Sequence, residues 1–413
     1  MIKRKRKKDL LLSLKRKEIT VLTGARQVGK TTLIKEIIRE LEAKGEKTLY
    51  FNLDIEREMA YFQSQETFLN KLRLELGDAP AYVFIDEIQR KEEAGLFLKG
   101  LYDMELPYKF TVTGSGSLEL KQKIGEALTG RKIQIYLPPV MFDEFIQYKT
   151  AYRYENRLPL YFETEKEKVA LLLNEYLTFG GYPAVVTAST QEDKTGIMQE
   201  IFQSYLTKDI AWLLHVKSPD KFVKMMQLLA AQAGGLLRYS DLAHDVTVTV
   251  QTLKTYLWYA EQTFMIHTVK PFFTNPKKEL TKSPMVYFND LGMLHFLRGT
   301  LPGNLKTGMD FQNFVYLILK EQFERPLSPV KYWRTKNKAE VDFVMVRDGQ
   351  VIPFEVKFSQ FKKPLISRSF RSFIEKYNPP RAYVVHTGNE MQTKIEKTEV
   401  WFIPYWKLYF LEN

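Results

Sequence analysis

The G-x-x-x-x-G-K-T pattern of residues 24–31 constrains the fold of this 413-residue chain more than any other segment. A β-branched apolar run, residues 19–23, comes directly before it, and apolar residues at three- and four-residue spacing follow it up to Leu41. This succession predicts a strand, a tight loop and a helix. Glycines let backbone N–H groups wrap around phosphate oxygens, and the helix N-terminus adds a partial positive charge. The loop therefore predicts a site for nucleotide phosphates.

The residues of this loop have separate expected roles. We expect Lys30 to reach the β- and γ-phosphates of ATP, and the Thr31 hydroxyl to bind Mg²⁺. ATP and Mg²⁺ are therefore the expected cofactors. The predicted nucleotide-binding residues are Gly24, Ala25, Arg26, Gln27, Val28, Gly29, Lys30, Thr31 and Thr32.

A second motif supports the same chemistry. Two further strands are predicted at residues 48–53 and 81–85, and the later one runs directly into Asp86 and Glu87. An apolar strand that ends in two acids is the Walker B arrangement, in which Asp86 completes the magnesium shell and Glu87 polarises the attacking water. The two motifs together predict an ATPase.

Two more residues are candidates for this site. Thr113 ends a predicted strand at residues 109–113, with Ser115 close behind, and a polar residue there can sense the γ-phosphate. The alternative is a plain junction between strand and turn. Arg131 precedes a fifth predicted strand, residues 133–137, and can stabilise the transferred phosphoryl group in its own chain or in a neighbouring subunit. The alternative for Arg131 is an ordinary surface arginine.

The middle of the chain is predicted to be mostly helical, with one break at residues 180–183. From Leu236 onward, two short helices capped by Ser240 and Thr249 precede two apolar strands at residues 265–269 and 285–288. This order predicts a winged helix. Its second helix exposes little positive charge, so we expect it to pack within the molecule rather than to bind DNA.

The second chemically informative pattern lies in residues 330–358, where three strands are predicted. Asp342 lies on the second of them, and Glu355 and Lys357 lie on the third. This is the D…E-x-K order of restriction-endonuclease-like nucleases, in which Asp342 and Glu355, with the carbonyl of Val356, hold Mg²⁺. Lys357 then orients or deprotonates a water. The alternative is a structural cluster of buried carboxylates and a lysine.

Together these motifs resemble those of prokaryotic AAA-type ATPases that carry the C-terminal domain of unknown function 4143. The resemblance implies an ATPase core, a winged helix and a nuclease-like C-terminal domain. One position departs from the pattern, because Gln312 stands where such domains usually carry a helix glutamate. A glutamine is a poorer metal partner, which counts against cleavage. The resemblance is carried by residues 23–31, 86–89, 113–115, 130–131, 180–183, 332–334, 340–343 and 354–357.

The expected fold class is α/β, in three parts. Residues 1–150 are predicted to form an AAA-type P-loop NTPase domain, and residues 151–300 a helical linker with the winged helix. Residues 301–413 are predicted to form a restriction-endonuclease-like α/β domain.

Composition limits the possible chemistry and the cellular location of the chain. The formal net charge of +12 is concentrated in residues 1–17 and 301–413, and the first of these is either a solvated terminus or a phosphate-binding arm. The chain has no cysteine, which excludes disulfides, thiol catalysis and thiolate metal sites. No apolar run approaches the roughly 20 residues that cross a bilayer. We therefore expect a cytoplasmic protein without a membrane partner.

Three functions follow from these patterns. In the first, ATP binding and hydrolysis switch the C-terminal domains toward a macromolecular partner, for which DNA, another protein and a second copy of the chain are the candidates. In the second, the same switch gates a metal-dependent DNA nuclease. In the third, the C-terminal fold is a non-catalytic module that binds nucleic acid or protein.

Overall fold

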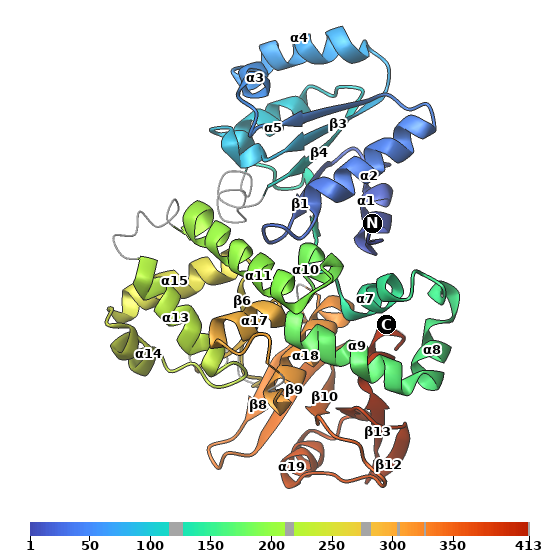
Figure 1. The fold of residues 1–413 in the computed structure, drawn as a ribbon, viewed down its shortest axis with the longest axis vertical. Helices are drawn as coiled ribbons and strands as arrows, with labels where there is room; N and C mark the ends of the chain where they lie inside the picture. Colours follow the sequence, from blue (N-terminus) through green and yellow to red (C-terminus); the bar gives the residue numbers. More distant parts are fainter. Residues whose placement is uncertain (115–126, 211–218, 274–281, 304–305, 326–327, 412–413) are drawn as a thin grey trace.

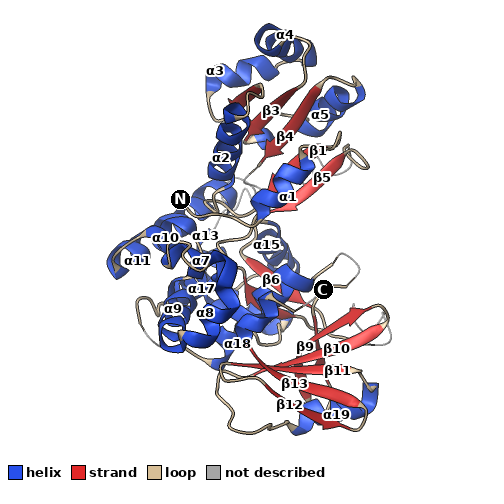
Figure 2. Cartoon of the chain, turned by 90° about the vertical axis from the view of Figure 1, so that its right-hand side faces the viewer, coloured by secondary structure: helices blue, strands red, loops and turns tan. Residues whose placement is uncertain are grey.

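The computed structural model describes residues 1–413 apart from 115–126, 211–218, 274–281, 304–305, 326–327 and 412–413. Figure 1 shows an N-terminal sheet with its helices at the top, a helical middle, and a second sheet at the bottom. Figure 2 shows the two sheets at opposite ends of the molecule, with helices between them.

The N-terminal sheet has five parallel strands in the order β2-β3-β4-β1-β5. Both faces of such a sheet are covered, which explains why its strands are nearly continuous apolar runs. The predicted strands are confirmed to within one residue at each end. The strands are β1 (Ile19–Thr23), β2 (Thr48–Asn52), β3 (Ala81–Asp86), β4 (Tyr108–Thr113) and β5 (Lys132–Tyr136), and the helices are α2 (Lys30–Ala43), α3 (Glu56–Met59), α4 (Gln65–Leu76) and α5 (Ala94–Asp103), with 3-10 turns η1 (Ala60–Phe62) and η2 (Ile88–Arg90).

The first part of the basic N-terminus is held against the rest of the chain. It folds into α1 (Arg6–Ser13), whose Leu10 is fully buried, and Ile2 is 8% exposed. Five of its basic side chains form ion pairs with acids elsewhere in the chain, which counts against a frayed terminus. Residues 15–17 are exposed, and phosphate binding by the N-terminus stays a prediction.

The middle of the chain is helical, as predicted. Thr249 caps α15 by accepting a hydrogen bond from the Thr252 N–H at 3.1 Å. Ser240 does not cap α14, because that helix already begins at Tyr239 and the Ser240 hydroxyl donates to Asp241. The helices are α7 (Phe142–Lys149), α8 (Leu158–Thr164), α9 (Lys166–Phe179), α10 (Pro183–Thr187), α11 (Gln191–Tyr205), α13 (Pro219–Ala231), α14 (Tyr239–Val246), α15 (Val250–Gln262) and α17 (Leu291–Arg298), with η3 (Glu155–Arg157) and the π-helical η4 (Leu206–Ile210).

The two strands that follow α15 are β6 (Ile266–Val269) and β7 (Met285–Phe288), and they pair antiparallel. Two helices followed by a two-stranded ribbon are the elements predicted for a winged helix. Residues 274–281, between the two strands, lie outside the described part of the chain. The winged helix itself therefore stays a prediction.

The C-terminal part is a mixed six-stranded sheet in the order β12-β13-β11-β10-β9-β8. Phe370 and Phe373 of α19 pack on one face, and the other face lies against α18. A Thr307 and Asp310 capping box starts α18, which is mainly apolar and is buried over most of its length, including its polar residues Gln312 and Asn313. The elements are α18 (Gly308–Phe323), β8 (Lys331–Arg334), β9 (Glu340–Arg347), β10 (Gln350–Val356), α19 (Arg368–Tyr377), β11 (Arg381–His386), β12 (Met391–Ile395), β13 (Thr398–Pro404) and η5 (Tyr405–Tyr409).

One hydrophobic core runs through all three parts. The Phe142 ring of α7 lies 5.3 Å from the Tyr176 ring and 5.5 Å from the Phe314 ring. It also lies 5.8 Å from the Tyr405 ring near the C-terminus. The domain boundaries at residues 150 and 300 therefore stay predictions, because apolar packing crosses both.

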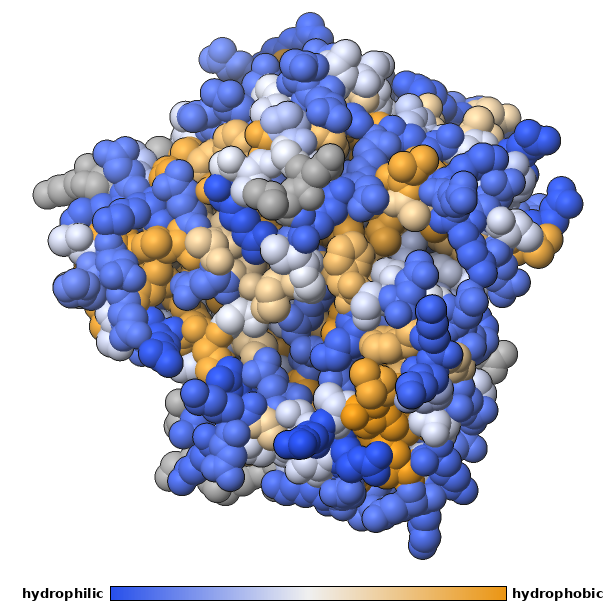
Figure 3. Space-filling model, turned by 60° about the horizontal axis from the view of Figure 1, so that its bottom comes forward, coloured by the Kyte–Doolittle hydropathy of each residue, from blue (hydrophilic) through white to orange (hydrophobic). Residues whose placement is uncertain are grey.

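Figure 3 shows a mainly hydrophilic lower face that is interrupted by separate apolar streaks. None of the helices in the described ranges combines the length and the apolar character that spanning a bilayer requires.

Candidate nucleotide site and C-terminal acidic cluster

The phosphate loop joins the end of β1 to the start of α2, as the sequence predicts. Gly29 is the residue before α2 and has φ 96°, and Gln27 has φ 60°, so both lie in the left-handed region. A Cβ atom on Gly24 would collide with the carbonyl oxygen of Leu137, which follows β5. Glycine is therefore required at 24 by close packing and favoured at 29 by the backbone.

Lys30 lies against this loop. Its side chain is buried, and Nζ donates hydrogen bonds to the carbonyls of Gly24 and Ala25, both at 2.9 Å. The ammonium group of Lys30 is therefore held at the phosphate loop by two carbonyl groups of the loop itself.

Asp86 ends β3 and is 2% exposed. The Thr31 hydroxyl donates to its Oδ2 at 2.6 Å, and the Thr113 hydroxyl donates to its Oδ1. Residues predicted for the site from three distant segments therefore meet at the carboxyl edge of the sheet.

The sequence did not identify Tyr50, whose hydroxyl also donates to Asp86 Oδ2, at 3.0 Å. Burial raises the pKa of Tyr50, and the nearby Asp86 carboxylate raises it further, so Tyr50 keeps its proton. Tyr50 lies on β2, and only the pairing of β2 with β3 brings it here.

Glu87 has a left-handed backbone, with φ 58°. Its N–H donates to the Thr113 hydroxyl at 3.4 Å, and its carboxylate accepts from the side-chain amide of Gln89. Gln89 is buried and was not predicted as a site residue. The Walker B acid is thus oriented by two neighbours.

Arg131 lies at the opposite edge of the sheet. Its carbonyl accepts from the N–H of Ile19, the first residue of β1, and its guanidinium pairs with Asp103 at 2.8 Å. Because β1 and β5 are parallel, a full strand length separates Arg131 from the phosphate loop. This position counts against action within its own chain and favours the two alternatives, an ordinary surface arginine or action in a neighbouring subunit, which stay predictions. Ser115 lies outside the described residues.

The C-terminal acids also meet. Phe343 of β9 pairs with Phe354 of β10, which places Asp342 and Glu355 next in register. Glu355 is 5% exposed and pairs with Lys357 at 3.0 Å, and its Oε2 has no hydrogen-bond partner among the described residues.

The donors around Asp342 are both N–H groups. The Gln312 side-chain amide donates to Oδ1 at 2.8 Å, and the Val356 N–H donates to Oδ2 at 2.7 Å. Burial raises the pKa of Asp342 to about 7. In the described ranges, no three His, Asp or Glu side chains are grouped so that they could hold a metal ion. Gln312 stands beside Asp342 where such domains usually carry a helix glutamate, and both the nuclease-like site and the structural cluster stay predictions.

Family models match three segments of the chain. An AAA domain matches residues 16–146, a domain of unknown function (DUF8612) matches residues 170–303, and a domain of unknown function (DUF4143) matches residues 307–408. The chain thus carries an AAA domain followed by a DUF4143 region, which matches a prokaryotic AAA-type ATPase with a DUF4143 C-terminal region.

Relatives of this AAA-type ATPase occur in bacteria and archaea. An uncharacterised protein of Mycobacterium tuberculosis is 28% identical over 385 residues, which cover 91% of this chain and 78% of the relative. One of Haemophilus influenzae is 24% identical over 401 residues and covers 94% of each chain. One of Methanocaldococcus jannaschii is 23% identical over 348 residues, which cover 83% of this chain and 75% of the relative.

Two solved structures are also similar. The Aeropyrum pernix ORC2 protein in its ADP form has a TM-score of 0.33 and 13% identity, over 71% of this chain and 92% of that one. The replication initiator DnaA bound to AMPPCP and single-stranded DNA has a TM-score of 0.31 and 14% identity, over 62% and 86%. These scores are low, and the assignment of a P-loop NTPase fold rests instead on the parallel sheet, the phosphate loop and the family model.

Residues 180–183, where the helical middle of the chain is interrupted, lie close to the phosphate loop. The Gly181 N–H donates to the buried Asp290 at 2.7 Å, and its carbonyl accepts from the Val140 N–H. Pro183 then starts α10, which borders a cavity of about 230 Å³. The cavity is lined by Met1, Ile2, Arg4, Val28, Gly29, Thr32, Leu33, Glu36, Pro183, Ala184 and Thr187.

Proposed function

We propose that this chain binds ATP with Mg²⁺ at residues 24–32 and hydrolyses it, and that its nucleotide state switches the C-terminal regions toward a macromolecular partner. The observation that carries the proposal is the buried Asp86 carboxylate, which holds the hydroxyls of Thr31 and Thr113 beside the phosphate loop. A cytoplasmic location, where ATP and magnesium are available, is part of this proposal.

Each residue of the site has its own role in the proposed ATP binding and hydrolysis. Lys30 binds the β- and γ-phosphates, and Thr31 and Asp86 would hold Mg²⁺, which neutralises phosphate charge. Glu87, oriented by Gln89, polarises the attacking water. Thr113 contacts both Asp86 and the Glu87 N–H, so it is suited to sense the γ-phosphate. Arg131 is retained only as a residue supplied to the site of a second copy.

The cavity beside Thr32 is the proposed site for the nucleotide base. It borders the phosphate loop, and most of its lining is apolar, which suits the faces of a planar ring. A bound nucleotide would then touch the N-terminal segment and α10 as well as the loop.

Phosphate release and ATP binding, measured on wild type and Glu87→Gln, test this proposal. We expect the variant to retain ATP and to lose turnover by a factor of about 10² or more, the range for a positioned general base. Glu92→Gln is the control, because Glu92 is an exposed acid on the same segment. Equal turnover in wild type and Glu87→Gln would refute the assignment.

The convergence of Asp342, Glu355 and Lys357 favours an ATP-gated DNA nuclease as a second candidate. Plasmid nicking with Mg²⁺ or Mn²⁺, with and without ATP, tests it on wild type and Gln312→Glu. Cleavage by either protein that Asp342→Asn abolishes would support the nuclease. If neither protein cuts DNA, the C-terminal region is better described as a non-catalytic module that binds DNA, a protein or a second copy.

A further inference from the structure

The segment of residues 2–9, which we name the strap, joins the phosphate loop to two helices that are distant in sequence. Its central residue is Arg4, which is 7% exposed. Arg4 Nη1 donates to the Val28 carbonyl at 2.8 Å, and Arg4 Nε donates to Glu144 Oε2 at 3.1 Å. Its Nη2 donates to the carbonyl of Pro138. One guanidinium therefore contacts the loop, the segment after β5 and α7.

The contact with Val28 bears on the shape of the phosphate loop. Val28 stands between Gln27 and Gly29, the two residues with left-handed backbones. A left-handed residue other than glycine costs energy and persists only where surrounding contacts hold it. The bond from Arg4 fixes the carbonyl between these two residues, so it stabilises the conformation that phosphate binding requires.

The strap is anchored on α7 by buried acids. Glu144 is 4% exposed, and besides Arg4 it accepts from the Lys5 N–H at 2.6 Å and the Met141 N–H at 3.0 Å. Lys5 also forms an ion pair with Asp143. Charged groups this deeply buried need such partners, so the strap and α7 form one unit.

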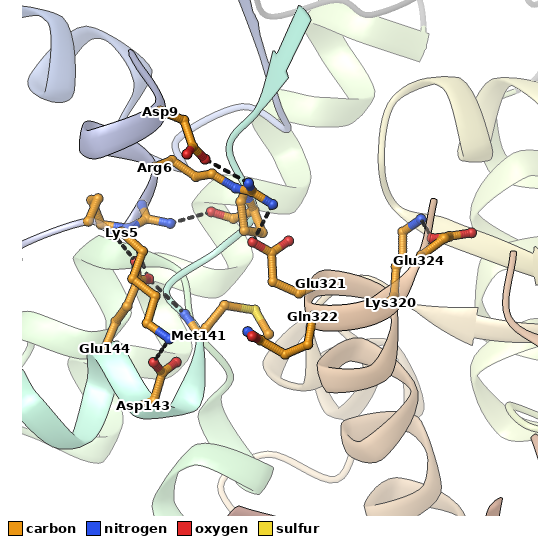
Figure 4. A network of polar contacts seen from close by, with 12 residues as sticks. Lys5, Arg6, Asp9, Met141, Asp143, Glu144, Lys320, Glu321, Gln322 and Glu324 are labelled. Atoms are coloured by element: carbon orange, nitrogen blue, oxygen red, sulfur yellow. Dashed lines mark hydrogen bonds and ion pairs between the residues drawn. The ribbon is translucent and has the colours of Figure 1, made fainter. Parts of the chain in front are cut away.

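The strap also reaches α18 of the DUF4143 region. Arg6 Nη2 lies 2.5 Å from Glu321 Oε1, and Figure 4 shows this pair bridging α1 and α18. A cavity of about 820 Å³ lies beside the pair, so the two helices are not tightly packed there. The other half of α18 carries Gln312, which donates to Asp342. One buried helix thus links the strap to the C-terminal acidic cluster.

We propose that Arg4 is a positioning residue for the phosphate loop and that the strap couples this loop to α18. Nucleotide binding fixes the loop, the fixed loop holds Arg4 and the strap, and Arg6 then holds the C-terminal end of α18 more firmly. The inference rests on the proposed function, because it requires a nucleotide at residues 24–32.

Hydrogen exchange of the full chain with and without AMPPCP tests the coupling. We expect AMPPCP to raise the protection of residues 318–323 by about fivefold or more in wild type, the lower end of typical coupling factors. Arg6→Gln should keep the rise at residues 24–31 and reduce the rise at 318–323 to less than twofold. Arg16→Gln is the matched control, because Arg16 lies in the same basic run but pairs with the neighbouring Glu18.

Affinity for AMPPCP tests the role of Arg4. Arg4→Met should weaken binding by roughly tenfold or more, and Arg4→Lys by about fivefold, because one ammonium cannot serve three acceptors at once. If Arg4→Met does not fold, the affinity of Arg4→Lys for AMPPCP is the test. An affinity equal to that of wild type would overturn the positioning role of Arg4. If wild type itself does not bind AMPPCP, the proposed function fails and this inference fails with it. If wild type binds AMPPCP, and AMPPCP raises the protection of residues 318–323 equally in Arg6→Gln and in wild type, then only the coupling through the strap is refuted.

Discussion

Two aspartates, the buried Asp86 in the N-terminal sheet and the half-buried Asp342 in the C-terminal sheet, have neighbours of different kinds. Asp86 accepts hydrogen bonds from the hydroxyls of Thr31, Tyr50 and Thr113. Asp342 accepts from two N–H groups, the side-chain amide of Gln312 and the backbone of Val356.

The difference matters because a hydroxyl both donates and accepts, whereas an amide N–H only donates. A threonine that now donates to Asp86 can rotate and offer a lone pair to Mg²⁺, which prefers oxygen ligands. An N–H group cannot do this, so it holds Asp342 in place without a cation. At the first site we therefore expect hydroxyl groups that can turn toward Mg²⁺, and at the second site we expect the N–H groups to keep Asp342 in place.

The largest effect that we expect in this comparison is at Lys30. Lys30→Ala should abolish detectable ATP binding, because the loop then lacks its fixed positive charge. Equilibrium titration with a fluorescent ATP analogue measures this. Lys44→Ala is the control, since Lys44 follows α2 and is exposed. If Lys30→Ala binds ATP with the affinity of wild type, the N-terminal half of the comparison is wrong.

Asp342→Asn should change how stability depends on pH. The pKa of Asp342 is about 7 in the folded chain, whereas an ordinary aspartate, as in the unfolded chain, has a pKa of 3.8. Between these two pH values the folded state therefore binds a proton that the unfolded state has lost. The free energy of unfolding of wild type therefore falls as pH rises from about 4 to 7, by up to about 4 kcal/mol from this group.

Asparagine resembles the protonated acid, so this loss should be absent from Asp342→Asn. Denaturant unfolding at pH 5 and pH 8 gives the comparison, and the test is the difference between the two proteins, since burial also raises the pKa of Glu321 to about 7. A variant whose stability falls as steeply as wild type would show that Asp342 is ionised throughout.

Gln312→Glu should make the second site resemble a metal site. A third carboxylate beside Asp342 and Glu355 repels both, and a divalent cation relieves the repulsion. At a Mn²⁺ concentration 100 times Kd, the folded state gains about 2.7 kcal/mol, which appears as a higher Tm.

The measurement belongs in the full chain with Asp86→Asn to remove the ATPase metal site, because the core continues across residue 300. The same chain with Gln312 intact is the control, and we expect little response to Mn²⁺ from it. An equal rise in both would mean that Asp342 and Glu355 bind metal without a third carboxylate.

The smallest effect is expected at Arg131. Its guanidinium pairs with Asp103 at the far edge of the sheet, so Arg131→Ala should change turnover by less than about twofold in a monomeric preparation. A loss of about 10³ or more would indicate an arginine finger. Mixing Arg131→Ala with Lys30→Ala would then show whether activity returns through a shared interface.

Much of the candidate site could be predicted because its parts are local. The loop from Gly24 to Thr31 depends on one strand, one turn and one helix that are adjacent in sequence. Asp86 and Glu87 are marked by the apolar strand that they end. The same holds for Asp342 and Glu355, whose strands are neighbours both in the chain and in the sheet.

The tertiary structure decided what lies beside these motifs. Tyr50 carries no motif, the contact of Gln89 with Glu87 is not evident from the sequence, and Arg131 pairs with Asp103 at the edge of the sheet opposite the phosphate loop. The order β2-β3-β4-β1-β5 sets these distances, and strand order depends on how whole helices pack rather than on local periodicity.

The AAA domain, with its phosphate loop and its Walker B strand, could be identified from the sequence alone, since short motifs fix their own geometry. The basic N-terminus shows the opposite case. Its charges could not be interpreted until burial placed Arg4 on Val28 and Glu144, and Arg6 on Glu321. Long charged side chains pair with the groups that folding brings within reach. For residues 2–9 these groups lie up to about 300 residues away in the sequence. No local sequence pattern can identify partners at such a distance.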